Sequence, residues 1–221
     1  LENEYKHLGL IMSEGGYTGD WNYDIRAESM SSAMIWAKVL YQYIHQNLEA
    51  AVYFTYDGLT YGMVNDGRRP MYYLFKLLKG RAGMEDSKWL KVTGDTEDMQ
   101  VLSFKSGDAF NVLLINSSLA NEKYQVTLNM SNVDGVSSFS SYVLSEKNNG
   151  EEKLNEIGFA KSISIETTPF TITLLQGKID KSLDKVAMVK FDEPPLSGAL
   201  GEMNAQNELF EQVFKIPGIE Q

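Results

Sequence analysis

The chain has 221 residues, of which 43% are hydrophobic, so it is long enough to bury a core in one large or two small domains. Its formal net charge of −10 argues against a nucleic-acid partner, because non-specific binding to phosphates needs a basic surface. The absence of cysteine excludes disulfide bonds and thiolate metal sites, and the two histidines, His7 and His45, are too far apart for a typical zinc site.

An apolar run near the start of the chain ends in a carboxylate. Leu8–Met12 is followed by Ser13, Glu14, the pair Gly15–Gly16 and Tyr17. Such a run favours a parallel strand that is buried on both faces, although a short buried helix fits the periodicity as well. Catalytic side chains of α/β barrels lie at the carboxyl ends of parallel strands, so Glu14 is the leading candidate for a functional residue.

The next segments predict two strand–helix units. Apolar residues recur at helical spacing from about Arg26 to Leu48, which indicates a long amphipathic helix. The β-branched and aromatic segment Ala50–Tyr56 predicts a second strand. Pro70 is well placed to begin a second helix that runs to about Lys79, where Gly80 stops it. This order predicts parallel strands with helices packed outside them, and two units alone cannot close a barrel.

From about Trp89 the pattern changes to short apolar runs separated by turn residues, which predicts about seven strands of an antiparallel β-sandwich. The predicted strands are Trp89–Val92, Met99–Phe104, Phe110–Ile115, Tyr124–Met130, Phe139–Leu144, Ser162–Glu166 and Phe170–Leu175. Glu146–Glu152 is predicted to be a loop. We therefore expect an α/β domain over residues 1–84, an all-β domain over residues 85–180 and a tail of uncertain structure over residues 181–221. No apolar run approaches the ~20 residues of a membrane span.

Five segments, taken in order, resemble the last two units of the barrel in clan A retaining glycoside hydrolases, family 30 first and family 39 next. They are Ile11–Glu14, the helical Ala33–Ala37, Val52–Tyr56, Tyr61–Val64 and Pro70–Tyr73. Members of this clan have a (β/α)8 barrel flanked by a β-sandwich, so the resemblance implies the carboxyl-terminal portion of a barrel followed by a sandwich. The chain also opens at Leu1 and enters the first strand almost directly, so we expect it to be a piece of a longer protein.

The resemblance implies a role for Glu14 as the catalytic nucleophile. In this clan the nucleophile is a glutamate at the end of the seventh strand, often after Ser or Thr, and Ser13–Glu14 fits that position. The alternative is a solvated glutamate at a strand end. The acid/base residue of the clan follows an asparagine at the end of the fourth strand, but every Asn–Glu pair here lies too close to Glu14 or after the barrel: Asn3–Glu4, Asn121–Glu122, Asn155–Glu156 and Asn207–Glu208. The proton donor is therefore expected to lie upstream of Leu1 or in another chain, or to be absent.

Aromatic side chains form sugar platforms in this clan because the apolar face of a pyranose packs on a ring. The resemblance implies this role for Tyr17 and Trp21 after the first strand and for Phe54 and Tyr56 near the end of the second. For Phe54 and Tyr53, ordinary barrel packing is the favoured alternative.

The implied activity is hydrolysis of a β-linked oligosaccharide or polysaccharide outside the cytoplasm, in an extracellular or periplasmic location. It needs no cofactor or metal, because two carboxylates are sufficient for glycosyl transfer to water. The missing amino-terminal part of the barrel would be the structural partner. A second reading, which rests on the missing acid/base, is a non-catalytic carbohydrate-binding or cell-surface module in which the β-sandwich binds the sugar.

Overall fold

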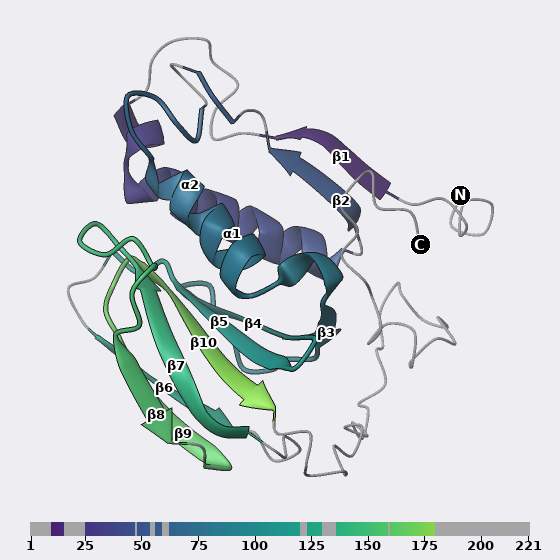
Figure 1. Ribbon diagram of the computed structural model, residues 1–221, viewed down its shortest axis with the longest axis vertical. Helices are drawn as coiled ribbons and strands as arrows, with labels where there is room; N and C mark the ends of the chain where they lie inside the picture. The colour runs from purple at the N-terminus through teal and green to yellow at the C-terminus, as the bar shows by residue number, and fades with distance from the viewer. Residues whose placement is uncertain are drawn as a thin grey trace.

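The computed structural model describes residues 10–15, 25–46, 48–53, 56–58, 62–119, 123–129, 136–158 and 160–179. The fold is mostly β-sheet with few helices (Figure 1). The elements in chain order are β1 (Leu10–Gly15), the 3-10 helix η1 (Ile25–Glu28), α1 (Met30–His45), β2 (Leu48–Tyr53), α2 (Pro70–Phe75), the π-helical turn η2 (Lys76–Arg81), the 3-10 helix η3 (Met84–Asp86), β3 (Lys88–Leu90), β4 (Met99–Ser106), β5 (Ala109–Asn116), β6 (Tyr124–Asn129), β7 (Val136–Leu144), β8 (Asn155–Gly158), β9 (Ser162–Thr167) and β10 (Thr171–Ile179). The predicted tail over residues 181–221 lies outside the described residues.

The first two strands form a parallel pair, as the order of elements predicted. β2 ends at Tyr53, three residues before the predicted end at Tyr56. The helix α1, which connects the two strands, begins at Met30 rather than near Arg26. Ser29 caps it, because the Ser29 side chain accepts a hydrogen bond from the Ser31 amide at 3.2 Å.

The second helix begins at Pro70, as predicted, but it continues past Gly80. The backbone passes from α2 directly into the π-helical η2, and the Ala82 amide donates to the carbonyl of Leu77. Gly83 follows with φ of +63°, in the left-handed region that favours glycine. Gly83, and not Gly80, therefore ends this helix.

All seven predicted β segments contain strands, and they form two antiparallel sheets. One sheet has six strands in the order β3-β4-β5-β10-β7-β8, and the other pairs β6 with β9. The strand β8 was not predicted; it lies at an edge of the large sheet and is largely exposed. The predicted loop Glu146–Glu152 is confirmed within the connection between β7 and β8.

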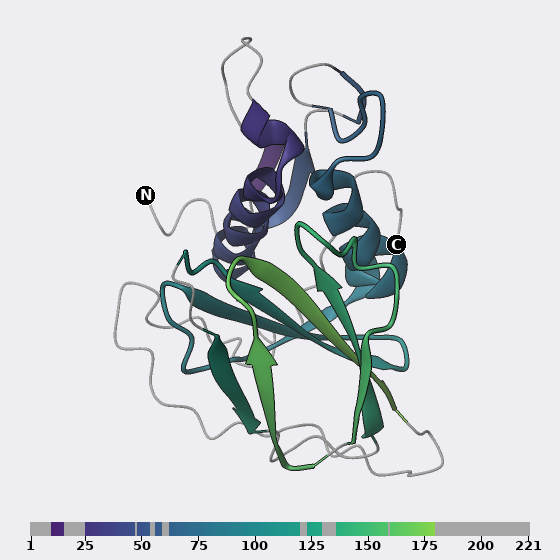
Figure 2. The same cartoon turned by 90° about the vertical axis from the view of Figure 1, so that its left-hand side faces the viewer.

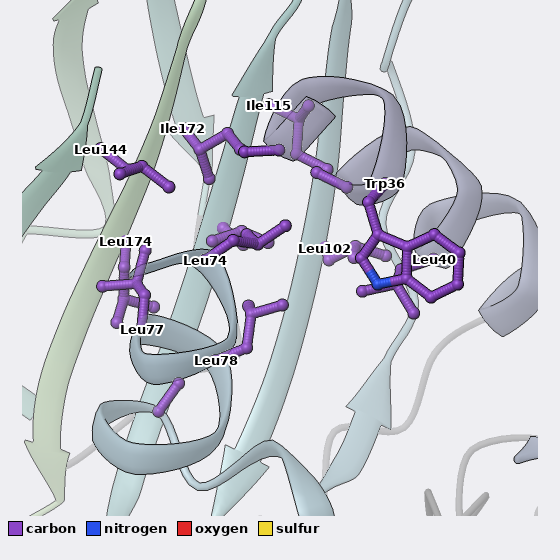
Figure 3. Close-up of a cluster of buried hydrophobic side chains, with 14 of the residues drawn as sticks. Trp36, Leu40, Leu74, Leu77, Leu78, Leu102, Ile115, Leu144, Ile172 and Leu174 are labelled. Atoms are coloured by element: carbon purple, nitrogen blue, oxygen red, sulfur yellow. The ribbon is translucent and has the colours of Figure 1, made fainter. Parts of the chain in front are cut away.

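The strands β4, β5 and β10 of the six-stranded sheet are buried on both faces over most of their length. The helices α1 and α2 lie between this sheet and the parallel pair, as Figures 1 and 2 show. The first core joins the helices to the sheet, and Figure 3 shows its side chains meeting from both sides: Trp36, Leu40, Leu74, Leu77 and Leu78 from the helical segments, and Leu102, Ile115, Leu144, Ile172 and Leu174 from the strands. A second core on the opposite face contains Val112, Leu114, Phe139 and Leu175, and Ile163 and Ile165 of β9 close it.

Candidate functional site

The two parallel strands end at one edge of the α/β part, and Glu14 lies at that edge. Met12 pairs with Ala51 and Gly15 pairs with Tyr53, so β1 advances three positions while β2 advances two. The extra residue forms a bulge that contains Ser13 and Glu14. Bulges are enriched beside active sites, where they turn a side chain away from the regular alternation. Glu14 thus belongs to an irregular strand end; its side chain lies outside the described part of the structure.

Tyr53, the last residue of β2, anchors this edge to the helices. Its ring contacts Trp36 of α1 edge-on, with 5.1 Å between the ring centroids, and lies 5.6 Å from the ring of Phe75. Burial raises the pKa of the Tyr53 phenol to about 12, and the positive charge of Arg69 opposes this rise. The favoured alternative for Tyr53, ordinary packing, therefore agrees with its contacts. Trp36 is a core residue as well, with 2% of its surface exposed.

The connection from β2 to α2 folds back on itself. The Val64 amide donates to the carbonyl of Tyr56 at 3.0 Å, and the Gly62 amide donates to the carbonyl of Gly58 at 3.1 Å. A Cβ atom at Gly62 would come within 2.4 Å of the Gly58 nitrogen, so only glycine fits there without a backbone shift. This close contact gives the segment after β2 a defined shape.

A buried arginine joins the segments that follow the two strands. Arg69 is 4% exposed, and its Nη1 donates to the carbonyl of Gly62 at 2.8 Å. Its Nη2 pairs with Oε1 of Glu28 in η1 at 3.0 Å. The neighbouring Arg68 is exposed, and its guanidinium lies over the Tyr72 ring, 4.9 Å from the centroid. Two adjacent residues of the same type therefore have different environments.

The predicted sugar platforms fall largely outside the described residues. This applies to Tyr17, Trp21 and Phe54. Tyr56 is described, lies three residues beyond the end of β2, and has 62% of its surface exposed. An exposed tyrosine at the carboxyl end of a strand is accessible to a ligand, and its role stays a prediction.

One of the four Asn–Glu pairs lies in the described part of the chain. Glu156 is on the edge strand β8, where Lys153 and Ser138 donate hydrogen bonds to its carboxylate at 2.6 and 2.8 Å. These bonds hold the pKa of Glu156 below its usual range. A general acid needs the opposite shift, so this pair does not supply the proton donor. Among the described residues, no group of three or more His, Cys, Asp or Glu side chains could hold a metal ion.

The interaction between Glu28 and Arg69 was not predicted from the sequence. The two residues are 41 positions apart, and neither belongs to a motif that indicates an ion pair. The sequence marks Arg69 only as the residue before Pro70 at the start of a helix, and this position does not indicate a partner for its side chain.

No protein-family model matches the chain, and no curated protein matches it significantly. Solved structures do match. The chain aligns with a family 30 subfamily 8 xylanase from Clostridium acetobutylicum at 16% identity and a TM-score of 0.64, covering 77% of this chain and 42% of that one. It aligns with a bifunctional glucanase-xylanase from a metagenome library at 17% identity and a TM-score of 0.64, covering 81% and 33%. A family 44 xyloglucanase from Paenibacillus polymyxa gives 14% identity and a TM-score of 0.62, with coverage of 80% and 33%.

The chain spans between 33% and 48% of the lengths of these and other matching structures. At 14–17% sequence identity, these matches show a similarity of fold and nothing more. The chain therefore has a fold found within glycoside hydrolases.

None of the helices in the described ranges has the length and apolar character of a membrane span.

Proposed function

We propose that this chain is the carboxyl-terminal part of a retaining β-glycoside hydrolase with Glu14 as its nucleophile. In this proposal, residues 1–84 form the last two strand–helix units of a (β/α)8 barrel, and residues 85–180 form an accessory β-sandwich. The observation that carries the proposal is the position of Glu14 in a bulge at the carboxyl end of β1, next to a parallel partner strand. The likeness of the fold to glycoside hydrolases supports it.

The reaction proceeds by double displacement. The Glu14 carboxylate attacks the anomeric carbon, the glycosidic bond breaks, and a second carboxyl group gives its proton to the leaving oxygen. That group, now ionised, takes a proton from water, whose oxygen attacks the anomeric carbon and releases Glu14. The second carboxyl group lies about 5–5.5 Å from the nucleophile in retaining enzymes. We expect it from the barrel segment upstream of Leu1.

The names of the proteins with a similar fold support a substrate class. Their names describe xylanase, glucanase and xyloglucanase activities, so we infer a β-linked polysaccharide or oligosaccharide substrate. Such substrates occur outside the cytoplasm, which supports the extracellular or periplasmic location that the family resemblance implies.

The direct test replaces Glu14 by Gln in the complete source protein. Xylan, mixed-linkage β-glucan and xyloglucan are supplied in turn, and released reducing ends are measured. We expect the rate on the accepted substrate to fall by a factor on the order of 10³ or more, as happens when a nucleophile is lost in other enzymes. Glu97→Gln, the same change at an exposed position, should leave the rate unchanged. Near-normal hydrolysis by Glu14→Gln would exclude the assigned nucleophile.

Chemical rescue gives a second, independent readout. In Glu14→Ala, added azide can occupy the space of the lost carboxylate and attack the anomeric carbon from the same face. The expected product is a glycosyl azide of inverted configuration, which NMR identifies. An azide-dependent rate that appears equally in Glu97→Ala would show that the rescue does not report on Glu14.

In the alternative function, a purely sugar-binding sandwich, the packing limits where a glycan could bind. The helices cover one face of the six-stranded sheet and β6 and β9 cover the other. A glycan would therefore have to bind at an edge, at a loop or on the outer face of the β6–β9 pair, where alternate side chains of both strands are exposed.

A further inference from the structure

Arg69 contacts both of the segments that follow the parallel strands. Glu28 belongs to η1, on the stretch of chain between β1 and α1. Gly62 belongs to the stretch between β2 and α2. One guanidinium therefore joins the two strand-to-helix connections of the α/β part.

The geometry of arginine suits this task. The guanidinium is a rigid planar fork, so Nη1 and Nη2 can donate in two directions while the side chain stays in one conformation. The Arg69 backbone is also fixed, because its amide donates to the Met63 carbonyl at 3.0 Å and its carbonyl accepts from the Tyr73 amide at 3.4 Å. A lysine could reach one of the two partners, but its single ammonium group lacks this fork.

The position of Arg69 relates it to the candidate site. Its charge acts on Tyr53, the residue at the end of β2 that pairs with Gly15. Gly15 directly follows Glu14. Gly62, whose carbonyl accepts from Arg69, donates in turn to the carbonyl of Gly58, five residues beyond the end of β2, so Arg69 is bonded to the segment that follows this strand.

We propose that Arg69 is a positioning residue of the glycosidase site, holding η1, which precedes α1, and the loop at Gly62, which follows β2, in one arrangement through Glu28 and Gly62. This inference rests on the proposed function. Catalysis depends on the relative placement of groups from different strand ends, and a displacement of about 1 Å can cost about 100-fold in rate. Arg69 acts through these segments and is not assigned a contact with the substrate.

The test uses the complete source protein and three substitutions. Arg69→Met removes both side-chain bonds and keeps an unbranched side chain, and Arg69→Lys keeps the charge without the fork. Arg68→Met is the matched control, because it changes the adjacent, exposed arginine. For each protein, kcat and KM are measured on whichever of xylan, β-glucan and xyloglucan the wild-type protein hydrolyses, and circular dichroism gives the folded fraction and the melting temperature.

We expect kcat per folded molecule to fall by about 100-fold in Arg69→Met, with KM changing much less. Arg69→Lys should regain part of the lost melting temperature and keep a low kcat, while Arg68→Met should resemble the wild type. A lowered melting temperature with normal kcat would show that Arg69 only stabilises the fold, and this result would overturn the proposal. An equal loss of kcat in Arg68→Met would overturn it too.

Two further outcomes are decisive. If Arg69→Met does not fold, Glu28→Met takes its place, because it removes both oxygens that can accept from Arg69 and keeps an unbranched side chain. Normal kcat in a folded Glu28→Met protein would overturn the inference. A wild-type protein that hydrolyses none of the three glycans would remove the proposed function and this inference with it. Wild-type activity with an unaffected Arg69→Met variant would overturn the inference alone.

Discussion

At the residue scale, ionisation of the Tyr53 phenol makes the stability of the folded protein depend on pH in the alkaline range. Its pKa in the folded protein is raised to about 12 from an ordinary value of 10, mainly because burial disfavours the phenolate. The folded state therefore holds the proton more tightly, so this contribution to stability is complete below pH 10 and is lost as the pH rises toward 12. Because Tyr53 is only partly buried, we expect the loss to be about 1–2 kcal/mol.

Urea denaturation of wild-type and Tyr53→Phe proteins at pH 8 and pH 11 measures this effect. The wild type should lose more stability between the two pH values than the variant, because phenylalanine has no proton to release. Tyr41, whose pKa is also raised by burial and by Asp95, is present in both proteins, so its contribution cancels in the comparison. Equal losses in the two proteins would contradict the assignment to Tyr53.

Single residues also show what a sequence can predict. The packing of Trp36 and Tyr53 could be predicted, because large aromatic residues in an amphipathic helix and a short strand are usually buried. The difference between Arg68 and Arg69 could not. Both follow the same turn, and only the folded path of the chain past Gly62 and Glu28 makes one of them a buried donor. The bulge at Glu14 was also invisible, because it depends on pairing with β2.

At the element scale, the start of α1 depends on Ser29. Its Oγ accepts from the Ser31 amide and donates to the Arg26 carbonyl at 2.8 Å, so it joins η1 to α1. Ser29→Ala should lower the free energy of unfolding by about 1 kcal/mol and lower the melting temperature with it. Thermal unfolding followed by circular dichroism in the complete protein measures the shift.

Two variants test the cause. Ser29→Asp should retain most of the stability, since aspartate also caps helices and favours the positive end of the helix dipole. Ser31→Ala removes the same hydroxyl two positions later, inside the helix, and should be neutral or slightly stabilising. If Ser31→Ala were as destabilising as Ser29→Ala, the cap would not be the source of the effect.

Elements were predictable where burial imposes a pattern. The seven apolar runs were found because strands within the sheets place hydrophobic side chains in the cores, whereas β8 is an exposed edge strand with little apolar pattern. The end of the second helix was wrong because glycine is only a weak stop signal inside a helix. The helix continues past Gly80 in a π-helical turn, and it ends where Gly83 adopts a positive φ.

At the scale of the whole molecule, the helices and the large sheet share one core. The sheet face toward the helices contains Leu102, Phe104, Leu113, Ile115, Leu144, Ile172 and Leu174, each at most 3% exposed. The sequence predicted the strands of this sheet but not that the helices cover one of its faces. β5 has buried residues from Phe110 to Asn116 without alternation, and such a run indicates two covered faces without showing what covers them.

This shared core predicts the behaviour of residues 85–180 produced without the helices. The uncovered face would exceed the apolar patch of a few hundred Å² that soluble monomers usually expose, so we expect this segment to self-associate and to bind a hydrophobic dye. Light scattering and dye fluorescence measure both, with the complete protein as reference.

Threonine at positions 102, 115 and 174 keeps β propensity and makes the face more polar, so this triple variant should be less associated. A monodisperse segment 85–180 that the threonine substitutions leave unchanged would show that the sheet does not need the helices, and a glycan-binding test on the isolated segment would then be meaningful. The expected association instead requires that any such test retain α1 and α2.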